Sequence, residues 1–152
     1  MNDMGILPYA YGPLHEVTSY SKLQCNGYTF STLAHEENLS TQNSGVSMKA
    51  YNKKGVLTTY YRVIRDIIDL NYTTFGHMVF YSNWVDMDEK NACKVDPASK
   101  LVIVNLSKLM SKNAIQDKPF ILASQTSQVF CIYFESILSR FLGCFDPLCV
   151  LY

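Results

Sequence analysis

Two runs of apolar, β-branched and aromatic residues, separated by a short polar turn, constrain this chain more than any other feature. The first run spans residues 57–70, the second spans residues 75–85, and Asn-Tyr-Thr-Thr occupies residues 71–74 between them. Such residue types favour a pleated surface, and two such runs around a turn are typical of a β-hairpin. The sequence therefore predicts a long hairpin in the middle of the chain.

The first run also fits a helix, because its apolar residues recur at helical spacing. In a regular strand, alternation would place Tyr61, Val63 and Ile67 on one face. The opposite face would then hold Tyr60, Ile64, Ile68 and Leu70. We favour the strand because it accounts for both runs and the turn, and a helix over residues 60–70 is the alternative.

Further short apolar segments lie between turn signals and predict additional strands. They occupy residues 26–33, 45–51, 101–106, 119–123 and 128–133. Several short strands separated by turns are typical of a small barrel or sandwich. We therefore expect a mainly β fold with a small barrel-like or sandwich-like antiparallel sheet.

The chain divides into three segments of different character. Residues 1–55 are expected to form an irregular lead-in with short strands, and residues 56–133 the β domain that contains the hairpin. Residues 134–152 form an atypical, apolar and Cys-rich tail, in which apolar residues keep helical spacing up to Gly143. A C-terminal helix fits this tail, and so does a loosely packed segment that is not native coding sequence.

The charge is balanced overall but uneven along the chain. Thirteen Lys and Arg residues match thirteen Asp and Glu residues, so the formal net charge is zero. A neutral chain lacks the broad positive field that drives non-specific nucleic-acid binding, and any DNA contact must come from a local patch. The candidate nucleic-acid-binding residues are the densest basic group, Lys49, Lys53 and Lys54, with Arg62 and Arg65 nearby. The alternative is a solvated loop that leads into a strand.

No motif in the chain indicates catalysis. The sequence contains neither a Gly-rich phosphate-binding motif nor a supported Ser/His/Asp or Cys/His arrangement. Asp86, Asp88 and Glu89 are close in sequence, but metal ligands for phosphoryl transfer usually come from separate elements, so we interpret them as a solvated acidic loop. We expect no enzymatic activity, no cofactor, no metal ion and no small-molecule substrate.

Cysteine usage and the chain start bear on the cellular compartment. The five cysteines are an odd number without C-x-x-C spacing, which argues against a disulfide framework and against a zinc site. The first residues lack a basic segment followed by an apolar run, and the uncharged stretch 119–134 is too polar to span a bilayer. We expect a nuclear or cytoplasmic protein that is not secreted and has no membrane partner.

Aromatic residues recur on the expected strands. Trp84 is the expected core anchor, and Phe120 and Phe130 are expected to pack with it, because aromatic residues in strands are usually buried. The alternative is that two or three exposed rings stack on bases or surround a methylated lysine.

A set of short motifs occurs in fixed order along the chain. They are Asn-Gly-Tyr-Thr-Phe at 26–30, Thr-Gln-Asn-Ser-Gly-Val at 41–46, Tyr-Tyr-Arg-Val-Ile at 60–64, Asn-Trp-Val-Asp at 83–86, Pro-Phe-Ile-Leu-Ala-Ser-Gln at 119–125 and Gln-Val-Phe at 128–130. The ordered set resembles the plant domain of unknown function 4216, found in proteins encoded by CACTA-class (En/Spm-type) DNA transposons. The resemblance covers about residues 58–132, with a lead-in from about residue 17.

This resemblance implies a transposon origin and a plant source, but it supplies no catalytic or ligand residues. The chain departs from the family at Ser82-Asn83, where a cysteine often precedes the Trp-Val-Asp motif, and in its apolar tail. We therefore expect a non-catalytic accessory domain that binds DNA or chromatin. The alternatives are a protein-interaction module, which could bind another element-encoded protein, and an inactive remnant.

Overall fold

The computed structural model describes residues 7–37, 39, 42–110, 119–131 and 148–151. Its helices and strands are, in chain order, α1 (Leu7–Tyr11), β1 (Thr18–Tyr20), β2 (Lys22–Cys25), β3 (Tyr28–Ser31), α2 (Leu33–Glu36), β4 (Gly45–Tyr51), β5 (Leu57–Asn71), β6 (Gly76–Trp84), β7 (Cys93–Val95), β8 (Val102–Asn105), β9 (Phe120–Leu122), η1 (Ala123–Gln125), β10 (Ser127–Gln128), β11 (Phe130–Cys131) and β12 (Leu148–Leu151). The fold is mainly β, as the sequence predicts.

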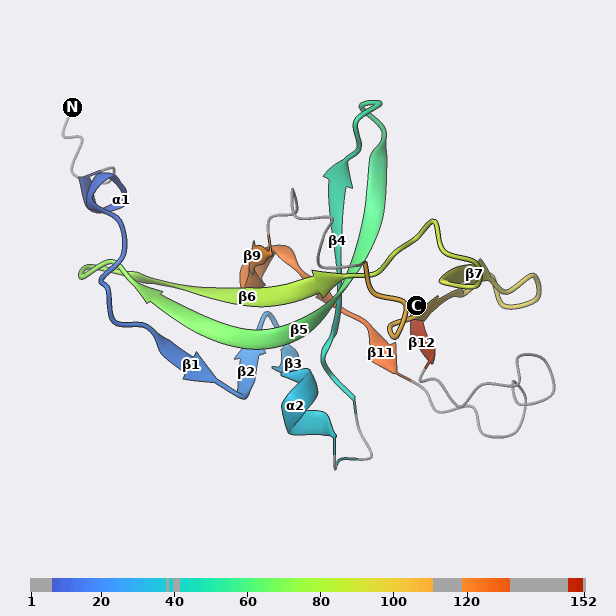
Figure 1. Cartoon of the computed structure of the whole chain (residues 1–152), viewed down its shortest axis with the longest axis horizontal. Helices are drawn as coiled ribbons and strands as arrows, with labels where there is room; N and C mark the ends of the chain where they lie inside the picture. The colour runs from blue at the N-terminus through green and yellow to red at the C-terminus, as the bar shows by residue number, and fades with distance from the viewer. Residues whose placement is uncertain (1–6, 38, 40–41, 111–118, 132–147, 152) are drawn as a thin grey trace.

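The largest sheet is built around β5. Its strand order is β10-β4-β5-β6-β9, and β1 also pairs with β5. The first half of β5 pairs with β4, and the second half lies between β1 and β6, all antiparallel. This arrangement confirms the predicted hairpin of β5 and β6, and it excludes the alternative helix over residues 60–70 (Figure 1).

A β-bulge interrupts β5 at Arg65. Ile64 lies opposite Ser82 and Asp66 lies opposite Tyr81, so Arg65 has no opposite residue on β6. A bulge inserts one extra residue into a strand, bends that strand and shifts the alternation of its side chains. In Figure 1, β5 turns from its ribbon with β4 into its ribbon with β6.

The bulge also changes which side chains of β5 share a core. Ile64 and Ile67 are both fully buried in the same hydrophobic cluster, whereas Tyr61 and Val63 belong to another cluster. The expectation that Ile67 shares a face with Tyr61 and Val63 was therefore wrong. The strict alternation behind that expectation fails because the strand contains one residue more than its partner.

The main sheet curls but does not close. Its edge strands β9 and β10 are joined by only residues 123–126, which can span roughly 15 Å when fully extended. The two edges must therefore approach each other, although β9 and β10 do not pair among the described residues. The result is an open, sandwich-like form of the expected antiparallel sheet rather than a closed barrel.

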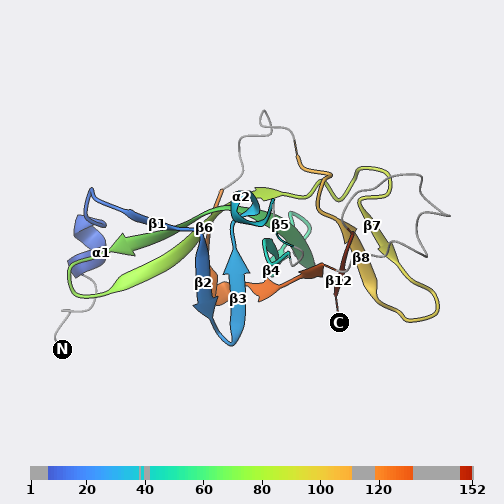
Figure 2. The same cartoon turned by 90° about the horizontal axis from the view of Figure 1, so that it is seen from below.

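Two hydrophobic clusters hold the fold together, and β5 contributes to both. One cluster lies between the main sheet and the β2–β3 hairpin, where the rings of Phe30 and Phe80 are 5.1 Å apart. The other joins Tyr61 and Val63 to Val104 of the second sheet, whose order is β11-β12-β8-β7. Each large apolar side chain buried in this way stabilises the fold by about 1.5–3 kcal/mol. Figure 2 shows the β2–β3 hairpin between α1 at one end and β7–β8 at the other.

The segment expected as an irregular lead-in belongs to the same cores. Phe30 and Val46 are fully buried, and β4 pairs along its whole length with β5. The expected boundary at residue 56 therefore falls between two paired strands. The expected helix over residues 134–143 lies outside the described residues, while residues 148–151 form β12, which pairs with β8 and β11.

Candidate nucleic-acid interface

The hairpin of β4 and β5 extends beyond the rest of the main sheet. On β4, strand β10 pairs only with Val46 and Ser47, and on β5, strand β6 pairs only from Arg62 onward. Residues 48–60 therefore form a two-stranded ribbon without a third strand among the described residues. We call residues 48–60 the arm, and Figure 1 shows it projecting from the body of the molecule.

The tip of the arm is a turn shaped by Asn52 and Gly55. The Asn52 side-chain oxygen accepts hydrogen bonds from the backbone N–H groups of Lys54 at 2.9 Å and Val56 at 3.0 Å. Gly55 has a φ of 75°, a left-handed conformation that strongly favours glycine. These two residues hold the Lys53-Lys54 pair at the outermost part of the arm.

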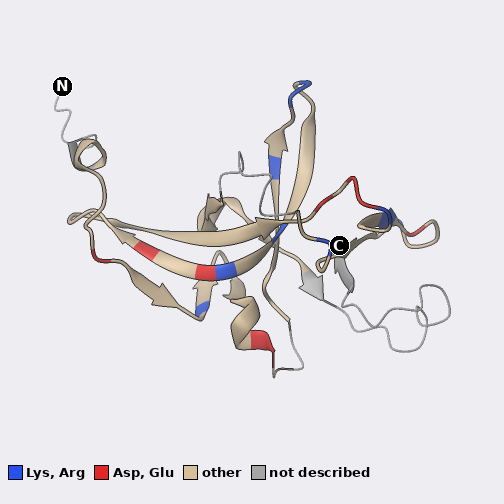
Figure 3. Ribbon diagram, in the orientation of Figure 1, with Lys and Arg blue, Asp and Glu red and all other residues tan. Residues whose placement is uncertain are grey.

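The arm carries positive charge without compensating carboxylates. Lys49, Lys53 and Lys54 are all exposed, and the sequence from residue 38 through residue 65 contains no Asp or Glu. Figure 3 accordingly shows the tip of the arm in blue and no red within the arm. The structure thus gathers three of the five candidate residues on one projecting element.

Apolar side chains accompany the lysines on the arm. Tyr51 is 74% exposed and lies opposite Leu57, which is also exposed, as is Val56 beside it. A two-stranded ribbon of this kind is only marginally stable by itself. An exposed mixture of cations and apolar groups on such an element is typical of a surface that meets a partner.

Arg62 lies inside the protein and is separate from the three lysines. It is 1% exposed, its guanidinium carbon lies 4.1 Å from the centre of the Trp84 ring, and it donates to the Ser82 carbonyl oxygen at 3.3 Å. A guanidinium that is packed on a ring in this way is not placed to reach a phosphate. Nothing in the local sequence distinguished this inward-facing arginine from an exposed one.

Arg65 is exposed, but it lies on the body of the molecule. It is the bulged residue of β5, and its neighbour Asp66 accepts a hydrogen bond from the Ser19 hydroxyl at 3.2 Å. Figure 3 shows the two opposite charges side by side on β5. The structure therefore does not bring Arg62 or Arg65 together with the lysines of the arm.

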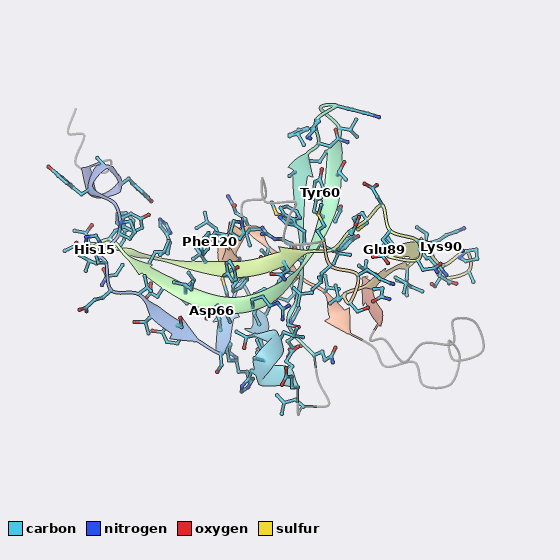
Figure 4. The ribbon with its side chains drawn as sticks, viewed as in Figure 1. His15, Tyr60, Asp66, Glu89, Lys90 and Phe120 are labelled. Atoms are coloured by element: carbon cyan, nitrogen blue, oxygen red, sulfur yellow. The ribbon has the colours of Figure 1, made fainter. Side chains whose placement is uncertain are left out.

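The packing around Trp84 differs from the expected core. Tyr60 contacts the Trp84 ring edge-on at 5.4 Å, and Trp84 is only half-buried. Phe120 is 54% exposed and instead contacts Tyr81 at 5.4 Å, so its expected packing with Trp84 was wrong. The reason is alternation, because Tyr81 and Trp84 point to opposite faces of β6. Figure 4 shows Phe120 on β9, away from Tyr60 on the arm. The side chain of Phe130 lies outside the described part of the structure, so its packing with Trp84 stays a prediction.

A family model matches part of this chain. Residues 68–139 match the family model described as Domain of unknown function (DUF4216). The match confirms only the resemblance to this domain of unknown function, over a span that begins later than residue 58. No curated protein and no solved structure matches the chain.

The DUF4216 match and the arm occupy different parts of the chain. The matched residues begin in the second half of β5, after the arm has ended at residue 60. They include the acidic loop, where Asp86 accepts from the Asp88 N–H at 3.1 Å and Glu89 pairs with Lys108 at 2.9 Å. Over the described ranges, no group of three or more His, Cys, Asp or Glu residues is placed to hold a metal ion.

Burial shifts the pKa of two titratable groups in and beside one hydrophobic cluster. Burial raises the pKa of the Cys93 thiol. Burial, together with the nearby Cys93, also raises the pKa of the Tyr61 hydroxyl. A thiol whose pKa is raised is less nucleophilic at neutral pH, because less of it is thiolate.

Sequence reasoning missed one aromatic cluster entirely. The rings of Tyr9, Tyr72, Phe75 and His77 all contact one another, with centroids 4.8–5.8 Å apart. The Tyr9 hydroxyl also lies 2.8 Å from Nε2 of His77. This cluster attaches α1 to the end of the β5–β6 hairpin. In the part of the chain that the structure describes, no helix has the length and apolar character to cross a membrane.

Proposed function

We propose that this chain is a non-enzymatic accessory module of a transposon-derived plant protein, and that it binds DNA or chromatin through the arm. The observation that carries the proposal is the projecting ribbon with three exposed lysines and no carboxylate. Lysines on such an element can approach phosphates without steric interference from the body of the molecule. A nuclear or cytoplasmic setting goes with this proposal.

The local positive charge of the arm favours contacts with phosphates, whereas the net charge of the whole molecule does not. The formal net charge of the chain is zero, so long-range attraction to nucleic acid is weak. Phosphate contacts by lysine release counterions from the nucleic acid, and this release provides affinity that depends strongly on salt. Binding should therefore depend on Lys49, Lys53 and Lys54 rather than on the total number of basic residues.

The proposed lack of enzymatic activity is supported by the state of the reactive groups. Cys93 and Tyr61 have raised pKa values, which is the opposite of what a nucleophile or base at neutral pH requires. In the acidic loop, the Asp86 carboxylate accepts a backbone hydrogen bond and Glu89 pairs with Lys108. These contacts are structural ones.

A titration with a matched control variant tests the binding proposal. The change is Lys49→Gln, Lys53→Gln and Lys54→Gln together, and the control is Lys22→Gln, Lys90→Gln and Lys94→Gln, which removes the same charge from exposed positions elsewhere. Figure 4 shows Lys90 well away from the arm. With a fluorescent 20-base-pair duplex at low salt, we expect the arm variant to bind at least about tenfold more weakly and the control within about threefold of the unmodified chain. Equal losses in the two variants would contradict the proposal.

A protein-interaction module is the second candidate, and the free edges of the arm favour it. The outer edges of residues 48–51 and 57–60 are unpaired in the described structure and can accept an added strand from a partner. Affinity from strand addition comes mainly from main-chain hydrogen bonds. It should therefore change little with salt, and this separates the two candidates.

A further inference from the structure

The shape of the arm indicates which nucleic acid it would contact. Resting on the proposed function, we infer that the arm enters the major groove of B-form duplex DNA. Strands 48–51 and 57–60 form a ribbon two strands wide, with Lys53 and Lys54 at its tip and Lys49 along its side.

The arm has the width and length of an element that fits the major groove. Adjacent strands lie about 4.8 Å apart, and a two-stranded ribbon with its side chains fits a groove about 12 Å wide. The minor groove, about 6 Å wide, would have to be widened to accept it. Four residues per strand give a length of about 13 Å before the turn, which exceeds the groove depth of about 8.5 Å.

The side chains of the arm match the surfaces of such a groove. One face of the ribbon carries the pairs Lys49–Thr59 and Tyr51–Leu57, and the other carries Met48–Tyr60 and Ala50–Thr58. The small Ala50–Thr58 pair keeps one face of the ribbon thin in its outer half. Threonine and apolar groups can contact base edges and thymine methyl groups, while the lysines reach the phosphates on the groove rims.

The same features disfavour other nucleic acids. Double-stranded RNA has a deep and narrow major groove that side chains cannot enter. Single strands are usually bound on several exposed rings that stack with successive bases. On the arm, Tyr51 is strongly exposed, whereas Tyr60 is half-buried against Trp84. The arm therefore does not present a row of stacking rings.

Groove-specific competitors test this inference with the full chain. We expect methyl green, which occupies the major groove, to displace the chain from a labelled 20-base-pair duplex, and netropsin, a minor-groove ligand, to leave it bound. We also expect single-stranded DNA and double-stranded RNA of the same sequence to bind at least about tenfold more weakly. Displacement by netropsin, or equal affinity for single-stranded DNA or for RNA, would overturn the inference while leaving the proposed function intact. Failure to bind any of these nucleic acids would overturn both.

A tyrosine substitution separates groove contact from rim contact. Tyr51→Ala should weaken duplex binding by about tenfold without changing the salt dependence, since the lost group is uncharged. The matched control is Tyr11→Ala, because Tyr11 is also strongly exposed but lies in α1 at the other end of the molecule. Circular dichroism would verify that both variants keep their strand content. Unchanged binding by Tyr51→Ala would show that only phosphates are contacted and would overturn the inference.

Discussion

The buried arginine shows how a single residue can occupy a core position against its usual preference. The Arg62 guanidinium lies over the Trp84 ring, a cation–π geometry that is worth more when the pair is shielded from water. Tyr60 packs edge-on against the same ring. The chain's own arginine thus occupies the aromatic site that could have held a ligand's cation.

Substitution of Trp84 should reveal the strength of this stack. Trp84→Ala should lower the free energy of unfolding by about 3 kcal/mol, because it removes a large ring and with it the cation–π contact of the Arg62 guanidinium. Trp84→Phe retains a ring face and should cost less than half as much. Urea denaturation measures both values. Equal costs for the two variants would mean that the ring face does not stabilise Arg62.

Glu36 is a second buried charged residue, and its contacts connect segments of the chain near the β2–β3 hairpin. It is 2% exposed, and one carboxylate oxygen accepts hydrogen bonds from the Ser31 hydroxyl at 2.5 Å and from the Asn43 N–H. Glu36→Ala should lower the free energy of unfolding by about 2–3 kcal/mol, since it leaves these donors without their acceptor. The neighbouring exposed Glu37→Ala should change it by less than about 0.5 kcal/mol. Thermal or urea unfolding with similar losses for both would contradict this role for Glu36.

Cys93 and Tyr61 should make the fold sensitive to alkaline pH. Their pKa values are raised by burial in the folded state, so the unfolded chain loses these protons at lower pH than the folded chain does. Their contribution to stability is complete below the ordinary thiol pKa of about 8.5 and is lost as pH rises through the folded pKa values. The urea midpoint should therefore fall from pH 8.5 upward, and less steeply in Cys93→Ala/Tyr61→Phe. Parallel pH profiles for the two proteins would refute this explanation.

At the scale of elements, the arm depends on a turn that only certain residues can form. Gly55→Ala should disfavour the turn by about 1–2 kcal/mol, because a φ of 75° brings a Cβ too close to the backbone. Faster amide hydrogen exchange at Lys54 and Val56 would report the loosening. We expect little change in exchange at Phe80, which lies in the core. Unchanged exchange in the arm would show that the turn tolerates a side chain at this position.

Features that depend on neighbouring residues could be predicted from the sequence. Features that depend on contacts between distant segments could not. The β5–β6 hairpin follows from two β-prone runs around a turn, and the lysines of the arm are close in sequence as well as in space. The inward orientation of Arg62 depends on pairing with β4 and β6, and the bulge at Arg65 has no sequence signature that we recognised. The contact of Tyr9 with His77 joins residues 68 positions apart, so no local pattern could indicate it.

At the scale of the whole molecule, one long strand belongs to three parts of the structure: the arm, the hydrophobic clusters and the main sheet. β5 supplies half of the arm, side chains to both hydrophobic clusters and the central pairing of the main sheet. The charges are unevenly distributed over the molecule. The arm carries lysines without carboxylates, whereas both signs of charge occur around the acidic loop (Figure 3). A molecule of zero net charge can therefore still present a positively charged surface.

The slope of log affinity against log salt concentration tests the central claim most directly. If all three lysines of the arm contact phosphates of a DNA duplex, they should contribute about −2.7 to that slope, at about −0.9 for each contact. We predict that the Lys49→Gln/Lys53→Gln/Lys54→Gln variant loses most of the slope and that the Lys22→Gln/Lys90→Gln/Lys94→Gln control retains it. A slope near zero for the unmodified chain, or the same slope in both variants, would contradict the claim that the arm binds nucleic acid.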